Sequence, residues 1–280
     1  MPELPEVETI RRDLAARIVG RSIAEVEVPD PAIFTGYKRG SKAPKDISLN
    51  GFVRDLKGKT ILHVLRFGKY LIFEFKQEGA LILHLRMTGQ LLVDPEQFKA
   101  RLRLVLTGAP NLVLVFQDQR RFGEVAYAQN WRLFEPLAKL GPEPLNGGLS
   151  PEHLRSKLKF RSASIHSLLL NQRIIAGLGN IYANEALFHS GIRPERCGNS
   201  ISGKEASALC ANIQKVLDQS IASRGYSMSN YVDTFGKRGA MQNHSWVYDW
   251  EGDPCRKCKT LIVRRILCGR SVYFCRKCQR

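Results

Sequence analysis

Four cysteines near the C-terminus constrain the fold of this chain more than any other feature. Cys255, Cys258, Cys275 and Cys278 form two Cys-x-x-Cys pairs separated by 16 residues. Each pair can present two thiolates to one tetrahedral ion, so the spacing predicts one structural zinc ion per chain in a closed site that is not itself catalytic. Disulfides and a redox Cys-x-x-Cys are the alternatives. Disulfides are disfavoured because we expect the chain to stay inside the cell, and a redox motif is disfavoured because two pairs flank a hairpin-length segment. The remaining cysteines are expected to be small core residues: Cys197, Cys210 and Cys268.

The charge balance indicates a polyanionic partner. The chain has 43 Lys and Arg against 26 Asp and Glu, a net charge of +17. Nucleic acid is the leading candidate, although ribosome association or a merely solvated surface fits the excess as well. Residues 251–280 alone carry nine basic and two acidic side chains, so we expect the C-terminus to lie on the partner.

Length and composition predict a folded chain of one large domain or two to three small ones. It has 280 residues, of which 44% are hydrophobic. No apolar run approaches the roughly 18 residues that cross a bilayer, and the acidic, proline-bearing start lacks the basic and apolar regions of a signal peptide. We therefore expect a cytoplasmic protein that does not associate with a membrane.

The first six residues carry a candidate catalytic group. Removal of Met1 would expose the secondary amine of Pro2, which can attack an electrophilic sugar carbon and form a Schiff base. Glu3 and Glu6 lie beside it, where carboxylates can transfer protons. The alternative is capping alone, because proline and acidic residues both suit the first turn of a helix.

Apolar spacing divides the chain into a strand-rich and a helical part. Residues 3–20 are typical of an amphipathic helix, and from Ala24 to about Tyr127 apolar residues alternate, which predicts antiparallel strands in a two-sheet sandwich. The Lys- and Gly-rich segment Gly36–Ser48 is expected to be an exposed loop. The alternating sets are Ala24, Val26 and Val28; Leu71, Phe73 and Phe75; and Leu102, Leu104 and Leu106.

A helical domain is expected to start near residue 142 and to end by Gly225. Ser202 and Glu205 form a predicted capping box before the apolar positions of one of its helices. Residues 226–244 then combine Gly, Ser, Asn and basic residues with weak periodicity, which is typical of a mobile or ligand-binding loop. The apolar positions of the capped helix are Ala206, Leu209, Ile213, Val216 and Leu217.

Three short segments have both a structural and a nucleic-acid-binding interpretation. Residues 177–182, Gly-Leu-Gly-Asn-Ile-Tyr, form a tight turn before a helix or offer backbone amides to a phosphate. Phe122, in the segment 118–123, is either a buried hairpin residue or a wedge inserted into a base stack, with Arg120 making hydrogen bonds. Met87 likewise is either a core residue or a wedge.

Together these segments resemble the bacterial formamidopyrimidine-DNA glycosylase family, which removes oxidised purines and then cuts the strand. The resemblance spans the whole chain, and the start after the proline differs from that of the related endonuclease VIII enzymes. It is carried by Pro2-Glu3-Leu4-Pro5-Glu6-Val7-Glu8-Thr9, Gly68-Lys69-Tyr70, Met87, Arg120-Arg121-Phe122-Gly123, Gly177-Leu178-Gly179-Asn180-Ile181-Tyr182 and the terminal zinc finger with Arg270.

The resemblance implies an α+β multidomain fold. It comprises an N-terminal antiparallel β-sandwich with flanking helices (2–135), a central helix-two-turn-helix domain (142–233) and a C-terminal β-hairpin zinc finger (245–280). A lesion-recognition loop would occupy about residues 226–244. The implied protein is a monomeric, nucleoid-associated base excision repair enzyme that acts on damaged double-stranded DNA.

The resemblance also implies roles for individual residues. Pro2 would form the Schiff base, with Glu3 shuttling protons and Glu6 helping to set the site. Lys69 and Arg270 would assist elimination of the flanking phosphates, which gives a bifunctional glycosylase and abasic-site lyase. The implied DNA-binding residues are Met87, Arg101, Arg120, Phe122, Arg161 and Asn180.

Several positions depart from the family pattern. The family usually has proline at Gln119, a histidine near Arg101, and a lysine followed by an aspartate-containing turn at His166 and Asn171. The lysine is associated with the lesion side of the site, so His166 bears on recognition of the damaged base. A relative with a shifted lesion preference and a noncatalytic zinc-ribbon protein that binds nucleic acid are the competing interpretations.

Overall fold

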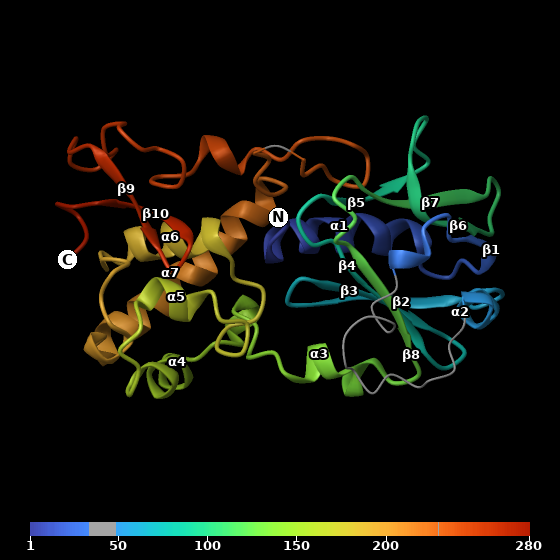
Figure 1. Ribbon diagram of the computed structural model, residues 1–280, viewed down its shortest axis with the longest axis horizontal. Coiled ribbons are helices and arrows are strands. Elements are labelled where there is room, and N and C mark those ends of the chain that lie inside the picture. The colour runs from blue at the N-terminus through green and yellow to red at the C-terminus, as the bar shows by residue number, and fades with distance from the viewer. Residues whose placement is uncertain (34–48, 229) are drawn as a thin grey trace. The chain divides into compact units, whose positions relative to one another are not determined.

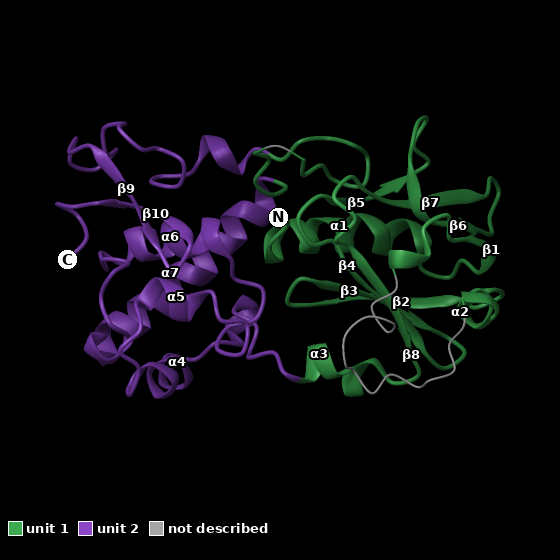
Figure 2. Cartoon of the chain, viewed as in Figure 1, with its two compact units in different colours: residues 1–138, 224–239 green, residues 139–223, 240–280 purple. Residues whose placement is uncertain are grey.

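The structure is a computed structural model that describes residues 1–33, 49–228 and 230–280. The predicted loop Gly36–Ser48 lies outside these residues. The chain divides into two compact units, which Figure 2 shows in different colours. Unit 1 comprises Met1–Ala138 with Arg224–Gly239, and unit 2 comprises Lys139–Ser223 with Ala240–Arg280.

The predicted two-sheet sandwich is confirmed in unit 1 (Figure 1). Each sheet has four antiparallel strands, in the orders β1-β6-β7-β5 and β2-β3-β4-β8. The first sheet contains β1 (Ile23–Glu27), β5 (Gly89–Val93), β6 (Ala100–Leu106) and β7 (Leu112–Asp118). The second contains β2 (Ile61–Phe67), β3 (Tyr70–Phe75), β4 (Ala80–His84) and β8 (Glu124–Ala128).

The core of unit 1 joins helix α1 (Leu4–Ile18) to both sheets. The helix buries one apolar stripe at spacings of three and four, as the sequence predicts, and packs on β2. Helix α2 (Leu49–Leu56) packs on β1. The buried core includes Val7, Ile10, Leu14 and Ile18 of α1, Leu71, Phe73, Leu81 and Leu83 of one sheet, and Leu102, Leu104, Leu114 and Phe116 of the other.

Two strands differ in detail from simple alternation. In β1 the register shifts between Ile23 and Glu25, so Ile23 is buried although the predicted inward positions were the even ones. A bulge of this kind re-aims the residues before it. In the second sheet Ile72 and Ile82 are paired and also buried, so β3 and β4 are covered on both faces.

Short helices continue the chain from the sandwich into unit 2. Helix α7 starts at the predicted capping box, where the hydroxyl of Ser202 accepts from the N–H of Glu205 and the Glu205 carboxylate accepts from the N–H of Ser202. It buries the predicted apolar stripe against α4 and α6. The helices are α3 (Glu135–Ala138), α4 (Pro151–Leu158), α5 (Ile165–Leu169), α6 (Asn180–His189) and α7 (Gly203–Ala222), with 3-10 turns at Pro31–Ile33, Trp131–Leu133, Leu145–Gly147, Gly198–Ser200 and Met241–Asn243.

The cysteine-rich C-terminus is a β-hairpin within unit 2. Strands β9 (Ile262–Leu267) and β10 (Arg270–Cys275) pair antiparallel, and β10 packs on α6. Phe188 of α6 shares a buried cluster with Val247, Ile262 and Tyr273. The hairpin therefore groups with the helices, whereas the division into domains 2–135, 142–233 and 245–280 stays a prediction.

None of the helices in the described part of the chain combines the length and hydropathy that a bilayer crossing requires.

Candidate active site

The three predicted catalytic residues at the start of the chain are buried in unit 1. Pro2 and Glu3 immediately precede α1, and Glu6 lies in its first turn. The backbone N–H of Glu3 donates to Oε2 of Glu6 at 2.7 Å, as part of a capping box. Capping and catalysis are therefore compatible interpretations. The capping box fixes the carboxylates of Glu3 and Glu6, and Glu3 directly follows Pro2 in the sequence.

Four charged side chains act on the amino group at the chain start. Burial lowers the pKa of the Met1 α-amino group below its usual range, and the positive charges of Lys69 and Arg120 lower the pKa further. Glu3 and Glu6 oppose this shift. Because the neutral form of an amine is the nucleophile, these surroundings favour attack by an amine held at this place.

Lys69 lies in the two-residue turn between β2 and β3 and is 7% exposed. Gly68 beside it has φ of 59°, a left-handed conformation that suits glycine in so tight a turn. Burial, followed by the charges of Arg86 and Lys69, lowers the pKa of the buried His84 well below its usual value. The neutral ring of His84 accepts a hydrogen bond from the N–H of Arg86 at Nδ1, at 3.0 Å.

Glu6 also binds the segment Arg224–Gly239, which belongs to the same unit. Its Oε1 accepts a hydrogen bond from the backbone N–H of Tyr226 at 2.8 Å. At the base of the segment, Arg224 pairs with Asp13 of α1, with 2.6 Å between Nη2 and Oδ2. The first part of the predicted lesion-recognition loop is thus bonded to α1, the helix that begins at the candidate catalytic residues. Residue 229 of this loop lies outside the described residues.

Met87, Arg120 and Phe122 form an exposed cluster on two neighbouring turns of unit 1. Met87 lies between β4 and β5, and the other two lie between β7 and β8. Nη1 of Arg120 is 3.5 Å from Sδ of Met87, and its guanidinium carbon is 4.8 Å from the centre of the Phe122 ring. Met87 is 42% and Phe122 50% exposed, so neither is a core residue and the wedge interpretation is the better supported.

The buried side chain of Asp118 holds these two turns together, a role that the sequence interpretation did not assign. Asp118 accepts hydrogen bonds from the hydroxyl of Thr88 and from the N–H groups of Arg120 and Gly123, and so ties the turn that carries Met87 to the turn that carries Phe122. Asp118 is the first residue of the segment 118–123, but nothing in that segment indicates that its carboxylate faces inward.

Arg101 lies beneath the same turn and is only 3% exposed. Its Nε pairs with Asp30 at 2.9 Å, and its Nη1 donates to the carbonyl of Gly123 at 2.9 Å and lies 3.6 Å from Asp118. Arg121 pairs with Asp30 from the solvent side at 2.8 Å. This geometry does not support the predicted contact between Arg101 and DNA, because the guanidinium is already bonded inside the unit.

In unit 2, Asn180 is the first residue of α6, directly after the glycine turn. Its Oδ1 lies 2.9 Å from Nε2 of His166, and its Nδ2 donates to the carbonyl of Ser271 in β10 at 2.9 Å. His166 is fully buried, so it does not present its ring to a bound base. Asn171 instead caps its own turn, accepting from the N–H of Arg173.

Two arginines of unit 2 that are predicted to act on DNA, Arg161 and Arg270, are exposed. Arg270 opens β10 and pairs across the strands with Leu267, next to the turn Cys268-Gly269. Arg161 follows α4. Cys268 and Cys197 are exposed, so the expectation that they are core residues is wrong. Cys268 lies in the hairpin turn, and Cys197 pairs with Ser164 in an isolated bridge at the surface; Cys210 is buried as expected.

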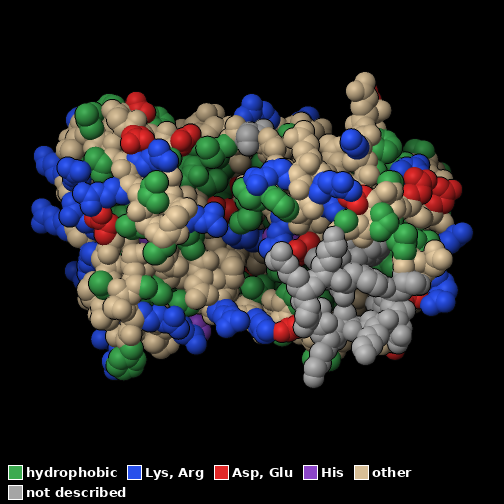
Figure 3. Space-filling view, viewed as in Figure 1, with side chains coloured by type: hydrophobic (Ala, Val, Ile, Leu, Met, Phe, Trp, Pro, Cys, Tyr) green, Lys and Arg blue, Asp and Glu red, His purple; other side chains and the backbone are tan. Residues whose placement is uncertain are grey.

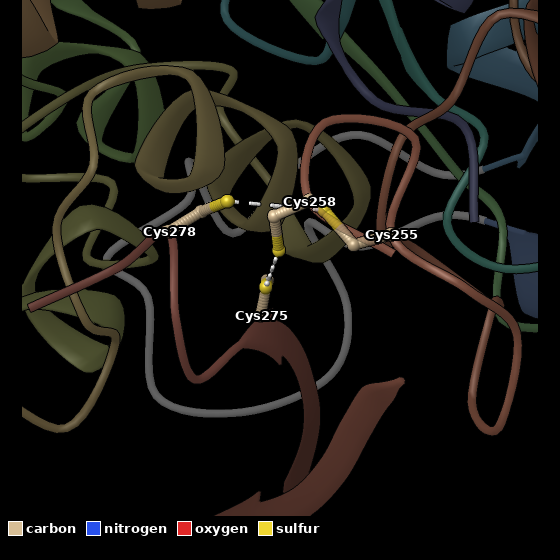
Figure 4. A group of neighbouring side chains, drawn as sticks. All are labelled: Cys255, Cys258, Cys275 and Cys278. Carbon is tan, nitrogen blue, oxygen red and sulfur yellow. Dashed lines mark hydrogen bonds between the residues drawn. The ribbon is translucent and has the colours of Figure 1, made fainter. Parts of the chain in front are cut away.

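The four predicted zinc ligands converge at the base of the hairpin (Figure 4). Their Sγ atoms all lie within 4.8 Å of one another, with 3.3 Å between Cys258 and Cys275 and 3.9 Å between Cys255 and Cys278. Four thiolates about 3.8 Å apart fit a tetrahedral zinc ion with Zn–S bonds of about 2.3 Å. The set is consistent with a structural zinc site.

Helix α6 holds residues 246–280 through two buried polar side chains that the sequence interpretation missed, one bonded to the hairpin and one to the segment before it. Oδ1 of Asn184 accepts from the N–H of Tyr273 at 2.7 Å. The Glu185 carboxylate accepts from three successive N–H groups, those of Trp246, Val247 and Tyr248, and burial raises its pKa. Their spacing on the helix gives no sign of these distant backbone partners.

Basic side chains recur over the visible face of each unit, whereas acidic ones occur in a few patches (Figure 3). This distribution agrees with the net charge of +17.

Comparison with known proteins identifies the family. The family model described as "Formamidopyrimidine-DNA glycosylase N-terminal domain" matches residues 1–125, and "Formamidopyrimidine-DNA glycosylase H2TH domain" matches residues 140–231. The chain belongs to the formamidopyrimidine-DNA glycosylase family. This confirms the predicted enzyme class, a bifunctional DNA glycosylase and lyase for oxidised purines, and the predicted fold.

Full-length relatives support the same assignment. The chain is 38% identical over 281 residues to the formamidopyrimidine-DNA glycosylase of Carboxydothermus hydrogenoformans and 41% identical over 286 residues to that of Desulfitobacterium hafniense, with all of each chain covered. Among solved structures, a mutant of the Lactococcus lactis protein in complex with DNA containing Fapy-dG has a TM-score of 0.88 at 33% identity, over all of both chains. The Lactococcus lactis complex with DNA containing an abasic site has a TM-score of 0.87 at 33% identity, over 99% of both.

Proposed function

We propose that this chain excises oxidised purines from duplex DNA by covalent catalysis at Pro2 and then cuts the strand by β,δ-elimination. The observation that carries the proposal is the pair of buried carboxylates, Glu3 and Glu6, fixed at the helix start that follows Pro2, where burial and the charge of Lys69 lower the pKa of the Met1 α-amino group. The chemistry requires removal of Met1, because the Pro2 nitrogen is otherwise part of a peptide bond.

In the first step the Pro2 nitrogen forms a bond to C1′ of a flipped nucleotide as the bond from C1′ to the base breaks. The departing base carries away the electron pair and takes up a proton. Opening of the sugar ring at the C1′–O4′ bond then yields the Schiff base. Glu3 shuttles the protons of these steps.

In the second step the Schiff base accepts the electrons released when a proton leaves C2′, and the 3′ phosphate departs. A second elimination releases the 5′ phosphate. Lys69 is assigned as a phosphate contact or proton donor, and Arg270 as the cation that assists the second departure. The zinc ion supplies no step; it folds the hairpin that carries Arg270.

DNA recognition is assigned to both units. Met87, Arg120 and Phe122 fill the gap left by the flipped base, which fits their joint exposure on two adjoining turns. Asn180 and Arg161 bind phosphates. Arg101 acts instead on the shape of the turn below Phe122. We infer a monomer in the bacterial cytoplasm, associated with the nucleoid.

Borohydride trapping tests the proposal. Protein of the mass expected after loss of Met1 should be trapped covalently on duplexes that contain oxidised guanine or an abasic site. Pro2→Gly protein, and protein with an extended N-terminus, should trap poorly. Equal trapping by all three would overturn the role of Pro2, and no trapping by any of them would favour a noncatalytic DNA-binding protein.

A lesion panel separates the remaining alternative. Glu3→Gln should slow release of oxidised purines more than cutting of a preformed abasic site, because only the first requires protonation of a departing base. Faster release of oxidised pyrimidines than of oxidised purines by the unaltered protein would instead indicate a relative with shifted lesion preference.

A further inference from the structure

His166, Asn180 and Ser271 form a hydrogen-bonded chain that links three elements of unit 2. His166 lies in α5, Asn180 begins α6 and Ser271 follows Arg270 in β10. The distances are 2.9 Å from His166 Nε2 to Asn180 Oδ1 and 2.9 Å from Asn180 Nδ2 to the Ser271 carbonyl oxygen. One asparagine side chain thus connects the glycine turn to the hairpin.

The carbonyl group of Ser271 fixes the orientation of the Asn180 side-chain amide. A carbonyl oxygen only accepts hydrogen bonds, so the NH₂ group of Asn180 must face Ser271 and its Oδ1 must face His166. Nε2 of His166 must then carry a proton and donate it to Oδ1. The opposite amide orientation would set two oxygens against each other at Ser271.

The surroundings of the ring fix the same tautomer. Burial lowers the pKa of His166 to about 4, with the Asn180 hydrogen bond opposing the shift and the charge of Arg270 adding to it. The ring is therefore neutral near pH 7 and has one proton. Among the described residues Nδ1 is buried without a hydrogen-bond partner, so a proton there would be unused, whereas a proton on Nε2 is bonded to Asn180.

We propose that His166 is a positioning residue that locks the Asn180 side chain in the orientation needed for a DNA phosphate. In this orientation one N–H of the amide is bonded to Ser271, and the second N–H and the backbone N–H of the first helical residue are the donors for a phosphate oxygen. The inference rests on the proposed phosphate contact of Asn180. It assigns to His166 an indirect role in place of contact with the damaged base.

Two substitutions of similar polarity separate this role from general packing. The side-chain nitrogen of glutamine reaches about as far as Nε2 of histidine, whereas that of asparagine reaches only as far as Nδ1. His166→Gln should keep the donor to Asn180 and leave affinity for a duplex with a tetrahydrofuran abasic analogue within about twofold of the unaltered protein. His166→Asn and His166→Leu should each weaken binding about tenfold, as expected for one lost hydrogen bond to a charged group.

A double-mutant cycle tests whether His166 acts through Asn180. Asn180→Ala should weaken binding by a similar factor, and adding His166→Leu to it should cause little further loss, because the positioned group is already absent. Neither change removes a charge, so the dependence of affinity on salt should keep its slope. Zinc content and the circular dichroism spectrum identify preparations whose folded state is intact.

The outcomes are decisive in both directions. Fully additive losses, or His166→Gln as weak as His166→Leu in folded protein, would overturn the positioning role. Unchanged affinity in Asn180→Ala would overturn it as well, by removing the contact on which it rests. Failure of the unaltered protein to be trapped by borohydride would reject the proposed chemistry instead, and it leaves these affinity comparisons interpretable.

Discussion

The carboxylate of Glu6 joins two distant parts of the chain by accepting the backbone N–H of Glu3 at Oε2, at 2.7 Å, and the backbone N–H of Tyr226 at Oε1, at 2.8 Å. A single buried side chain therefore sets both the helix start that carries Glu3 and the start of the segment Arg224–Gly239. The bond to Glu3 alone would be an ordinary helix cap, and the bond to Tyr226 is a contact between distant segments. Together they make the geometry of the chain start depend on that of the loop.

Glu6→Gln tests this dependence. Glutamine has one oxygen and one NH₂ group, so it can accept only one of the two backbone N–H groups and sets the NH₂ against the other. A buried donor left unsatisfied costs about 1–3 kcal/mol of folding stability, and base release should slow because the chain start loses its fixed position. Single-turnover base release measures it. The matched control is Glu27→Gln, an exposed carboxylate paired with Arg103, and an equal loss there would contradict the role of Glu6.

Arg270 should contribute one phosphate contact. Arg270→Ala is expected to flatten the dependence of log affinity on log salt by roughly one contact. Arg265→Ala is the matched control on the same hairpin, because Arg265 is already paired with Glu195 at 2.6 Å. Titration of abasic-analogue duplexes at several salt concentrations gives both slopes, and identical slopes for the two variants would contradict the assignment.

The exposed cluster gives a prediction that depends on the substrate. Met87→Ala and Phe122→Ala should slow base release most on fully paired lesions, where unstacking requires a few kcal/mol, and least on abasic or single-stranded DNA. Arg120→Ala should also relax discrimination of the opposite base. Base release across matched, mismatched and abasic duplexes measures the effect, and uniform losses on all substrates would mean that the side chains only stabilise the fold.

Asp30 should make the stability of unit 1 sensitive to acid. Hydrogen bonds from Arg121 and then Arg101 hold the pKa of Asp30 at about 2, although burial opposes the shift. A carboxyl group with a lowered folded-state pKa stabilises the fold above its unfolded pKa of about 3.9, and that contribution is lost as the pH falls toward 2. The difference in urea midpoint between the unaltered protein and Asp30→Asn should therefore shrink between pH 5 and pH 3. A constant difference would show that Asp30 stays protonated or unpaired.

Much of the fold followed from patterns with a local cause. The apolar stripe of α1 and the capping box of Ser202 and Glu205 depend on neighbours within a few residues, and the cysteines fall into two such pairs joined by one hairpin. The structure confirms all three. The β-sandwich followed from alternation, with the register shift at Ile23 as the exception. A bulge depends on the partner strand, so one strand read alone does not reveal it.

The functional site was predictable where a motif places residues side by side, and not where distant segments meet. Met87 and Phe122 could be named but not distinguished from core residues, because exposure depends on how two turns adjoin. Arg101 was expected to meet phosphate, yet Asp30, 71 residues away in the sequence, holds its Nε. The partners of Glu6 and His166 were hidden for the same reason.

Removal of the zinc ion should destabilise helix α6 as well as the hairpin. A closed four-thiolate site couples metal binding to folding by about 10–16 kcal/mol, so elemental analysis should find one zinc per chain, and Cys258→Ser or chelation should unfold residues 251–280 and abolish DNA binding. Because Oδ1 of Asn184 accepts from the N–H of Tyr273 in β10, loss of the hairpin leaves this buried oxygen of α6 without its partner. Amide hydrogen exchange should therefore quicken in α6 as well as in the hairpin, while the sandwich strands of unit 1 stay protected. Zinc-free protein with full DNA affinity, or with α6 as protected as before, would contradict this coupling.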